Sequence, residues 1–537
     1  MDPTLALKNF GTPVDTIDQI DKEIKALEKR ILTLRTARNR LASFSRFPTE
    51  LLTEIFLLAR DGSSEPRGLT VLTISWVCRY WREMSLGTPC LWSYIDFTQL
   101  DWVQAFLARS SNAKLDLMIK AEPTDPIVPV FLQALPRIRE LLLGAIMDEA
   151  LSRQWSAPGP VLEHLVLENV DIPDDLLAGQ CPVLRHLALF ECAFDVELLG
   201  SFPNLVELRL TGSPIMISDT VPDVVKVLRS LPRLEVLYLV RILDARPWTH
   251  STAVEPAKLS HLRHLELKKE SSATVAALFR LLILPEGTNI TLSSLELEQV
   301  TDPATLFRSV NIYGCIDSHK VDMLLVAFTP HYLALTLREI GPGGKGNVLR
   351  NIALSFRLKF DTPEIEVPRA IVRLLREVPL THLPSLDISV NNMEAPSFLW
   401  SQVFGPLTEL RTVKVGLACA QSFVNHIWSQ SIKISDEDSQ SPKTFPALQT
   451  LTVHGMSHNP LSSDFVHLRC ALETRNQSLP RLPRLVVIGP PLPDRVVDEL
   501  QFVVEDLVTM TSGDHNADWE GHLFDPEPRD SEEEFSD

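Results

Sequence analysis

Apolar residues near the start of the chain recur at alternating intervals of three and four. The apolar residues of this seam are Ile17, Ile20, Ile24, Leu27, Ile31, Leu34 and Leu41. One further seam position, between Leu34 and Leu41, is the polar residue Arg38. This heptad pattern predicts a helix over residues 16–43, begun by a capping box of Thr16 and Gln19. Two alternatives stay open: a short coiled coil that forms a weak homodimer through residues 17–41, or a single amphipathic helix that packs on its own chain.

A second helical pattern begins at Pro48, where proline costs no helical hydrogen bond. Its apolar positions cover a broad arc and are Leu51, Leu52, Ile55, Phe56 and Leu58. After a polar loop from Asp61 to Gly68 a second stripe follows, formed by Leu72, Ile74, Val77, Cys78, Trp81 and Met84, and closed by Leu91, Trp92 and Ile95. The pattern predicts a small all-helical domain over residues 44–97.

The rest of the chain repeats one leucine frame, L-x-x-L-x-L, often preceded by proline. Successive frames start at residues 138, 162, 184, 205, 234, 262 and 292, in steps of 24, 22, 21, 29, 28 and 30. Further frames at 349, 383, 410, 448 and 482 follow with longer insertions. These steps are typical of leucine-rich repeats, in which each unit supplies one strand and a return helix or loop. The pattern predicts an irregular solenoid over residues 98–512, with a parallel sheet on its concave face. The fold class is therefore a multi-domain mixture of α+β and α/β parts.

Charge and composition narrow the function classes. Lys and Arg number 51 against 69 Asp and Glu, a net charge of −18, which disfavours nucleic-acid binding. Half of this charge lies in residues 513–537, which hold ten acidic residues and one arginine and are expected to form a disordered tail, like residues 1–15. Seven scattered cysteines favour the cytoplasm, the nucleus or both. The longest apolar run, residues 273–284, contains Arg280 and is too short to span a membrane.

Residues 47–95 resemble the F-box motif in order and spacing. The resemblance rests on Phe47-Pro48-Thr49-Glu50-Leu51-Leu52-x-x-Ile55-Phe56, Val77-Cys78-Arg79-x-Trp81-Arg82 and Pro89-x-Leu91-Trp92-x-x-Ile95. With the preceding heptads and Arg38-Asn39-x-Leu41, the chain is similar to the F-box-like proteins common in mushroom-forming fungi. Phe47 replaces the usual leucine, and the Asp61–Gly68 loop is longer than in compact versions.

The resemblance implies a docking surface for a Skp-type adaptor and, through it, a cullin. The residues that it assigns to adaptor contact are Pro48, Leu51, Leu52, Ile55, Phe56 and Trp81. The alternative is that these side chains fill the core of their own module. Binding energy concentrates on a few buried anchors, so replacing both Leu52 and Phe56 by lysine is expected to abolish adaptor binding.

No pattern for catalysis, metal binding or cofactor binding is found. Gly341–Gly346 formally matches the dinucleotide fingerprint, but the alternating residues Ile352 to Phe360 after it predict a strand instead of the required helix. His454 and His458 lack an acidic third ligand. The chain is therefore expected to be a non-catalytic protein with no cofactor and no metal.

The solenoid offers a target-binding surface on the predicted concave face. Alternate residues of each strand point outward there, and columns from neighbouring strands lie side by side. The predicted target-binding residues are Phe190, Arg209, Val236, Tyr238 and Val240, beside an acidic edge of Glu266, Glu296 and Glu298. His164 and His186 are predicted to be neighbours in the first column. The alternative is that a helix over residues 101–120, the tail or another copy covers this face.

Together these patterns favour one function and leave one alternative. The chain is expected to be the substrate receptor of a Skp–cullin–F-box ubiquitin ligase that holds an unidentified protein target on its repeats. The alternative is a ligase-independent protein-interaction scaffold built from the same modules. Neither reading involves nucleic acid or a membrane.

Overall fold

The computed structural model describes much of the chain, and the chain forms two compact units, residues 1–186 and 187–537. The described residues are 13–41, 47–63, 66–97, 99–120, 127–144, 157–212, 220–243, 254–297, 321–328, 332–340, 348–358, 372, 375–376, 378, 380–388, 399–433, 445–454, 463–477 and 479–511. Most of the predicted N-terminal segment 1–15, the predicted tail 513–537 and the Gly341–Gly346 loop lie outside them.

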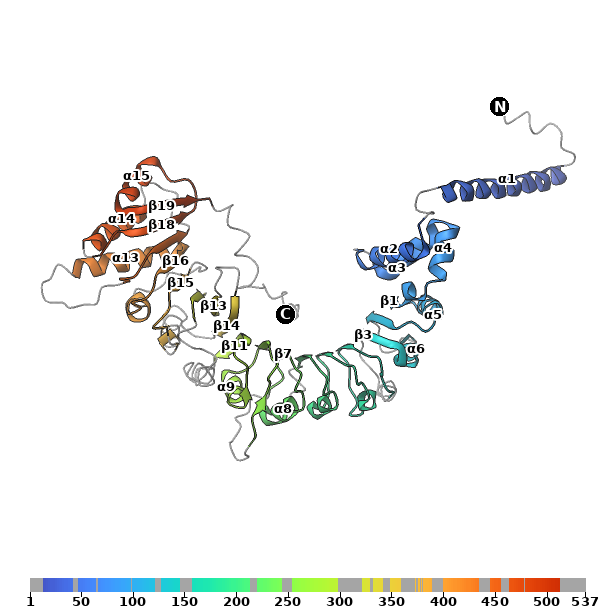
Figure 1. Ribbon diagram of the computed structural model, residues 1–537, viewed down its shortest axis with the longest axis horizontal. Coiled ribbons are helices and arrows are strands. Elements are labelled where there is room, and N and C mark those ends of the chain that lie inside the picture. Colours follow the sequence, from blue (N-terminus) through green and yellow to red (C-terminus); the bar gives the residue numbers. More distant parts are fainter. Residues whose placement is uncertain are drawn as a thin grey trace, which may run out of the picture. The chain divides into compact units, whose positions relative to one another are not determined.

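The first unit begins with a series of helices (Figure 1). They are α1 (Pro13–Leu41), α2 (Thr49–Asp61), α3 (Arg67–Val77), α4 (Arg79–Leu86) and the short η3 (Pro89–Trp92). The stripe predicted to run unbroken from Leu72 to Met84 is interrupted at Cys78, whose backbone is extended (φ −159°, ψ 170°). The Cys78 sulfur accepts the Trp81 N–H at 3.5 Å and so caps the start of α4.

Aromatic packing forms the core of these helices. The rings of Phe56 and Trp81 lie 4.8 Å apart, and those of Trp92 and Phe106 lie 4.9 Å apart. Trp92 is 1% exposed, and its indole N–H donates to the Ser85 carbonyl at 2.7 Å. A buried indole with a satisfied N–H combines a large apolar contact with no unpaired donor, which makes Trp92 a central residue of this core.

The prediction of an all-helical module up to residue 97 was wrong at its end. Tyr94 and Ile95 form strand β1, which pairs in parallel with β2 (Leu115–Lys120). The prediction of one helix over residues 101–120 was also wrong in its second half. The helix α5 ends at Arg109 (Leu100–Arg109), and the end of that segment forms β2. The sheet continues in parallel through β3 (Ile138–Gly144) and β4 (His164–Glu168). α6 (Ile127–Gln133) and η4 (Leu135–Arg137) precede β3, and η6 (Leu176–Gly179) follows β4. The helical segment thus runs directly into the sheet.

Strand β5 (His186–Phe190) crosses the boundary between the units, and the second unit then continues the repeating pattern. β6 (Glu207–Thr211), β7 (Val236–Val240), β9 (His264–Lys268) and β11 (Asn289–Leu297) pair in parallel. η7 (Val196–Ser201) precedes β6, and α8 (Val221–Leu228) lies between β6 and β7. β8 (Ala257–Lys258) precedes β9 and pairs with β10 (Leu282–Ile283), which follows α9 (Ser272–Arg280) and precedes β11. Figure 1 shows α8 and α9 on one side of these strands, so that among the described helices neither covers the other side.

The end of the second unit departs from a purely parallel sheet. β12 (Met323–Phe328) and β13 (Tyr332–Ile340) are antiparallel to each other, and β13 is antiparallel to β14 (Val348–Leu358). Parallel pairing resumes from β12 through β15 (Ser385–Ile388), β16 (Thr412–Gly416), β17 (Thr450–His454), β18 (Leu482–Ile488) and β19 (Val504–Met510). Helices η8 (Trp400–Phe404), α13 (Leu417–Lys433), α14 (Ser463–Asn476) and α15 (Asp494–Val503) lie between these strands in sequence. The fold is a mixed α/β structure with a mostly parallel sheet, as predicted, but β12, β13 and β19 were missed.

The leucine frame determines where each strand begins. The first leucines of five successive frames, Leu162, Leu184, Leu205, Leu234 and Leu262, are at most 2% exposed, and each strand starts two residues later. After four of these strands the chain turns through a left-handed residue, namely Asn169, Glu191, Arg241 and Lys269 (φ 50–58°). After β6 the residue at this position is Gly212, whose backbone is not left-handed; here an added Cβ atom would lie 2.1 Å from the Arg241 carbonyl oxygen. Each frame thus combines a buried leucine ladder with a tight turn, which is the local basis of the repeat.

Candidate protein-binding surfaces

The open strand face of the second unit is built from three columns of side chains. Strand register places Glu207 beside Val236 and His264 in the first column, and Arg209 beside Tyr238 and Glu266 in the second. The third column runs through Thr211, Val240 and Lys268. The intervening leucines point to the opposite side and are buried, for example Leu237 and Leu239 at 0% exposure. The predicted alternation of outward and inward side chains therefore holds along these strands, except at Val240.

Arg209, Tyr238 and Glu266, here called the central cluster, meet in the second column. The Arg209 guanidinium lies over the Tyr238 ring at 5.9 Å from its centroid and forms an ion pair with Glu207. Burial raises the pKa of Tyr238, with a further increase from the Glu266 charge. Burial likewise raises the pKa of the Glu266 carboxyl, while Lys268 and Arg209 oppose the shift. Tyrosine and arginine are among the residue types enriched at the energetic centres of protein interfaces.

The remaining predicted target-binding residues differ in exposure. Phe190 and Val236 are half-buried on the open face. Val240 is only 6% exposed, so its prediction as a surface residue was wrong. It ends β7, immediately before the turn that leads to the buried residues Ile242 and Leu243. The last residues of the neighbouring strands, Thr211 and Lys268, are half-buried, so Val240 is an exception to an alternation that holds beside it.

The predicted acidic edge does not form as expected. Register places Asn289 beside His264, Thr291 beside Glu266 and Ser293 beside Lys268. Glu296 stands beyond a register shift between Leu292 and Leu295 and pairs with Arg357 of β14, and Glu298 lies outside the described residues. The missed residues Asn289, Thr291 and Ser293 alternate with Ile290 and Leu292. This frame overlaps the Leu292/Leu295/Leu297 frame, and the hydrophobic pattern does not decide between the two.

Glu270 is a buried carboxyl behind this face that the sequence analysis did not identify. It lies two residues after β9 and is 2% exposed. One of its oxygens accepts the backbone N–H groups of Ile242 at 2.8 Å and Leu243 at 3.4 Å. Burial raises its pKa to about 7, although both hydrogen bonds act in the opposite direction. Glu270 thus links the turn after β7 to the turn after β9, in a manner that depends on pH.

The helical segment of the first unit presents a different surface. Leu52 and Phe56, predicted to contact an adaptor, are 0% and 2% exposed and belong to the core. Leu51 and Ile55 are exposed on α2, as is Pro48 before it. Trp81 is half-buried against Phe56. The two buried residues were assigned wrongly because the broad apolar arc of α2 does not reveal which side faces inward. Leu58 and Trp76, at 73% and 65% exposure, extend the exposed apolar surface.

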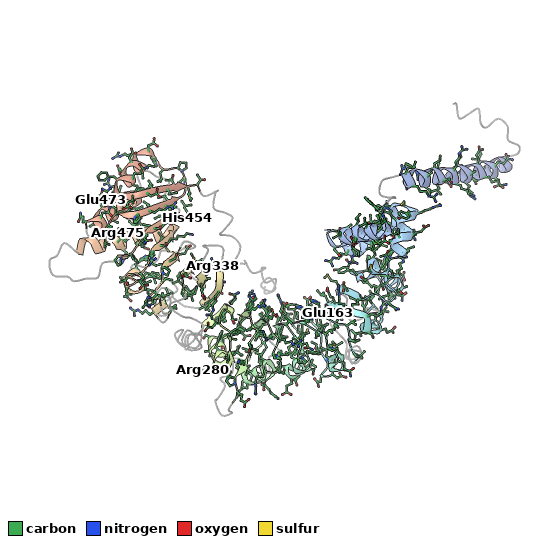
Figure 2. The ribbon with its side chains drawn as sticks, in the orientation of Figure 1. Glu163, Arg280, Arg338, His454, Glu473 and Arg475 are labelled. Carbon is green, nitrogen blue, oxygen red and sulfur yellow. The ribbon has the colours of Figure 1, made fainter. Side chains whose placement is uncertain are left out.

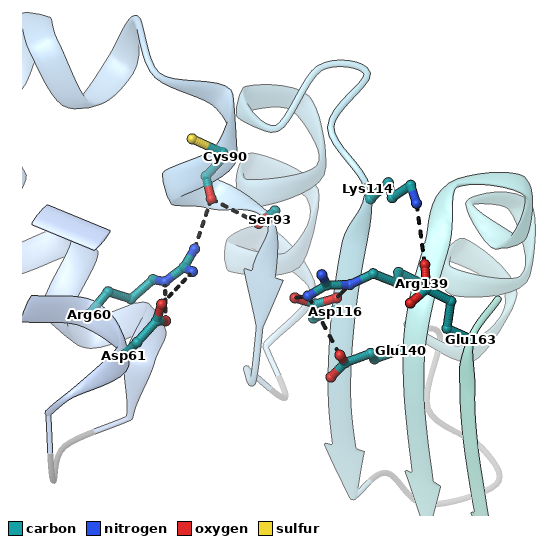
Figure 3. A network of polar contacts seen from close by, with 9 residues as sticks. All are labelled: Arg60, Asp61, Cys90, Ser93, Lys114, Asp116, Arg139, Glu140 and Glu163. Carbon is teal, nitrogen blue, oxygen red and sulfur yellow. Dashed lines mark hydrogen bonds and ion pairs between the residues drawn. The ribbon is translucent and has the colours of Figure 1, made fainter. Parts of the chain in front are cut away.

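Polar contacts hold the first unit together near this surface (Figure 3). Arg60, at the end of α2, donates to the Cys90 carbonyl at 2.8 Å and to the Asp61 carboxylate at 2.8 and 3.2 Å. On the sheet, Arg139 donates two hydrogen bonds to Asp116 at 3.0 and 2.7 Å, and this pairing raises the pKa of Arg139. The first set fastens α2 to η3, and the second joins β3 to β2. Arg60 and Arg139 each form an ion pair with a carboxylate of the same unit, so both have a structural role.

His164 and His186 are neighbours, as predicted. Their rings stack with centroids 4.2 Å apart and planes inclined by 2°. Burial lowers the pKa of His164, and the neighbouring His186 lowers it further. Among the described residues, no group of three or more His, Cys, Asp or Glu side chains is placed to hold a metal ion. The pair is therefore a ring-stacking contact between the first residues of β4 and β5.

Comparison with known proteins finds one curated relative and no matching family model. The chain is 28% identical over 165 residues to a human tubulin-specific chaperone cofactor E-like protein, covering 25% of this chain and 39% of that protein. The chain thus spans well under half of the length of the curated relative that it matches. Among the described helices, none has both the length and the apolar character needed to cross a membrane.

The expected function as a ubiquitin-ligase substrate receptor was wrong. The protein that the chain resembles carries the name of a chaperone cofactor and not of a ligase subunit. The burial of Leu52 and Phe56 also removes two of the residues on which adaptor docking was predicted to depend. The comparison is consistent with protein partners and gives no support for a Skp-type adaptor or a cullin.

Proposed function

We propose that this chain is a non-catalytic, leucine-rich-repeat protein that binds tubulin in the manner of a chaperone cofactor. The open strand face of the second unit holds the protein client. Binding by such a face needs no reacting group in this chain, because a partner is held by shape, apolar contact and charge.

The leucine-rich-repeat assignment is supported by three features that recur together. Each frame begins with a buried leucine, continues as a short parallel strand and ends in a left-handed or glycine turn. Steps of 21 to 30 residues between the first seven frames fit one strand and one return segment per unit. A single unit cannot bury its leucines alone, so stacking of neighbours accounts for the continuous apolar interior.

The central cluster is the observation that carries the binding proposal. Tyr238 is half-buried between a cation, Arg209, and an anion, Glu266. A partner that covers this cluster removes the tyrosine ring from water and meets charges of both signs within one small area. Such a centre with a charged surround is typical of a binding hot spot.

Tubulin is proposed as the client because of the named relative. The resemblance covers a quarter of this chain, and the relative's name specifies tubulin as the protein on which it acts. In this chain the repeats supply the extended strand face, and faces of this kind are the binding surfaces of repeat proteins. We therefore assign tubulin binding to the repeats and not to the helical segment.

Titration of the full chain with purified tubulin tests this proposal. Tyr238→Ala is expected to raise the dissociation constant about 30-fold, the loss expected when a hot-spot side chain is truncated. Phe502→Ala is the matched control, because Phe502 is a 73% exposed aromatic residue of α15, away from the open face of β6–β9. Equal affinities for wild type and Tyr238→Ala, or no binding by wild type, would overturn the proposal.

A further inference from the structure

Helix α1 exposes a long apolar stripe. Its seam residues Ile17, Ile24, Leu27, Ile31, Leu34 and Leu41 are between 47% and 74% exposed, and Ile20 is half-buried. The stripe follows the heptad seam along the helix, with charged residues on both flanks. Continuous apolar stripes of this kind mark contact surfaces, because a solvated helix gains nothing from them.

We propose that α1 pairs with α1 of a second copy of this chain in an antiparallel, two-stranded coiled coil centred on Lys29. In heptad notation, residues 17, 24, 31 and 38 occupy a positions and residues 20, 27, 34 and 41 occupy d positions. Antiparallel pairing about Lys29 places an a residue of one helix against a d residue of the other in every layer. Three layers then join an isoleucine to a leucine, namely Ile17 to Leu41, Ile24 to Leu34 and Ile31 to Leu27. The fourth joins Ile20 to Arg38, so the polar seam position meets an apolar residue and not its own copy.

Charge along the helix favours this orientation. Residues 17–28 hold four acidic and two basic side chains, whereas residues 29–41 hold five basic and none acidic. Antiparallel pairing places the acidic half of each helix against the basic half of the other. A parallel dimer would bring two basic halves together and would place Arg38 against Arg38 of the second copy inside the seam.

The flanking positions distinguish the two orientations in detail. In the antiparallel dimer, Asp21 faces Arg35 of the second copy twice, once at each end. Glu28 faces Glu28 of the second copy once on one flank, and Arg30 faces Arg30 of the second copy once on the other flank. In a parallel dimer, Glu23 faces Glu28 twice and Arg30 faces Arg35 twice, so all four of these contacts are repulsive. The antiparallel arrangement therefore has two attractive and two repulsive contacts in place of four repulsive ones.

Sedimentation equilibrium of the full chain over about 1 to 100 μM tests the pairing. Wild type is expected to reach twice the mass of one chain. The double variant Leu27→Lys/Ile31→Lys, which places charges in the central layers, is expected to remain monomeric. The control is Leu32→Lys, because Leu32 is 47% exposed but lies outside the seam, and it should dimerise like wild type. A monomeric wild type, or a dimer unaffected by the double seam variant, overturns the proposal.

Charge reversal tests the orientation. Asp21→Arg and Arg35→Asp are each expected to raise the dimer dissociation constant about tenfold, and the combined variant should restore it. A parallel dimer predicts instead that Arg35→Asp tightens association, because it would face Arg30. A dimer that responds in that way overturns the antiparallel assignment. Tubulin titration is a separate measurement, so failure of either proposal can be recognised independently.

Discussion

Replacing Glu270 with glutamine tests how burial of one carboxyl determines the pH dependence of the second unit. Glu270 is 2% exposed and accepts hydrogen bonds from Ile242 and Leu243. Its pKa in the folded protein is raised from 4.5 to about 7, chiefly by burial. Between these pH values the folded protein keeps a proton that the unfolded chain has released. Folding is therefore favoured at low pH, and stability is lost as pH rises toward 7.

The magnitude follows from the size of the shift. Each pKa unit corresponds to about 1.4 kcal/mol, so the local structure is expected to lose about 3 kcal/mol between pH 4.5 and 7 through this group. Glutamine cannot ionise and retains an acceptor oxygen for the two backbone N–H groups. Glu270→Gln should therefore remove this contribution to the pH dependence without removing the link between the turns.

Amide hydrogen exchange at Ile242 and Leu243 is the appropriate assay, because it reports local opening in a chain with two compact units. After correction for the intrinsic effect of pH on exchange, wild-type protection should fall from pH 5 to pH 8, whereas protection in Glu270→Gln should vary much less. Glu286→Gln, a change at an exposed glutamate of the same unit, should retain the wild-type profile. Wild-type protection that stays constant or rises with pH would refute the reasoning.

Three further predictions concern stability. Leu52→Ala should destabilise the helical segment by about 2–5 kcal/mol because it leaves a cavity, whereas Leu58→Ala at a 73% exposed position should have little effect, and denaturant unfolding compares them. Glu191→Asn should stabilise the second unit by about 0.5–1 kcal/mol in the same assay, because asparagine tolerates the left-handed backbone at φ 53°. Gly212→Ala should cost about 3 kcal/mol or more, since its Cβ would lie 2.1 Å from the Arg241 carbonyl oxygen, whereas Gly489→Ala, with nothing within 4 Å, should be tolerated.

The leucine frame was the most readable part of the sequence because its period and its burial coincide. A leucine repeated every 21 to 30 residues with the same internal spacing predicts strand starts such as His186 and Val236, and the structure places them there. Where two frames overlap in one segment, as in β11, the pattern does not decide. Ile290 and Leu292 form one alternation and Leu295 and Leu297 another, and the register shift between them cannot be located from hydrophobicity alone.

The remaining errors arise where tertiary packing overrides a local pattern. The apolar arc of α2 includes both core and surface residues, so Leu52 and Leu51 could not be distinguished until the neighbours of α2 were placed. The antiparallel strands β12 and β13 have no proline-led leucine frame and were missed. Glu270 gave no signal because its burial depends on a turn 28 residues earlier in the chain. Side-chain alternation nevertheless identified Arg209 and Tyr238 as neighbours on one face.

Amide hydrogen exchange of the full chain with and without purified tubulin tests the central claim most directly. Binding to the open face of the second unit predicts slower exchange in β6, β7 and β9, centred on Tyr238. Figure 2 draws the described side chains on the ribbon in the orientation of Figure 1. The helices α2 and α3 should show no change. Protection confined to α2 and α3, or no protection at saturating tubulin, would contradict the account.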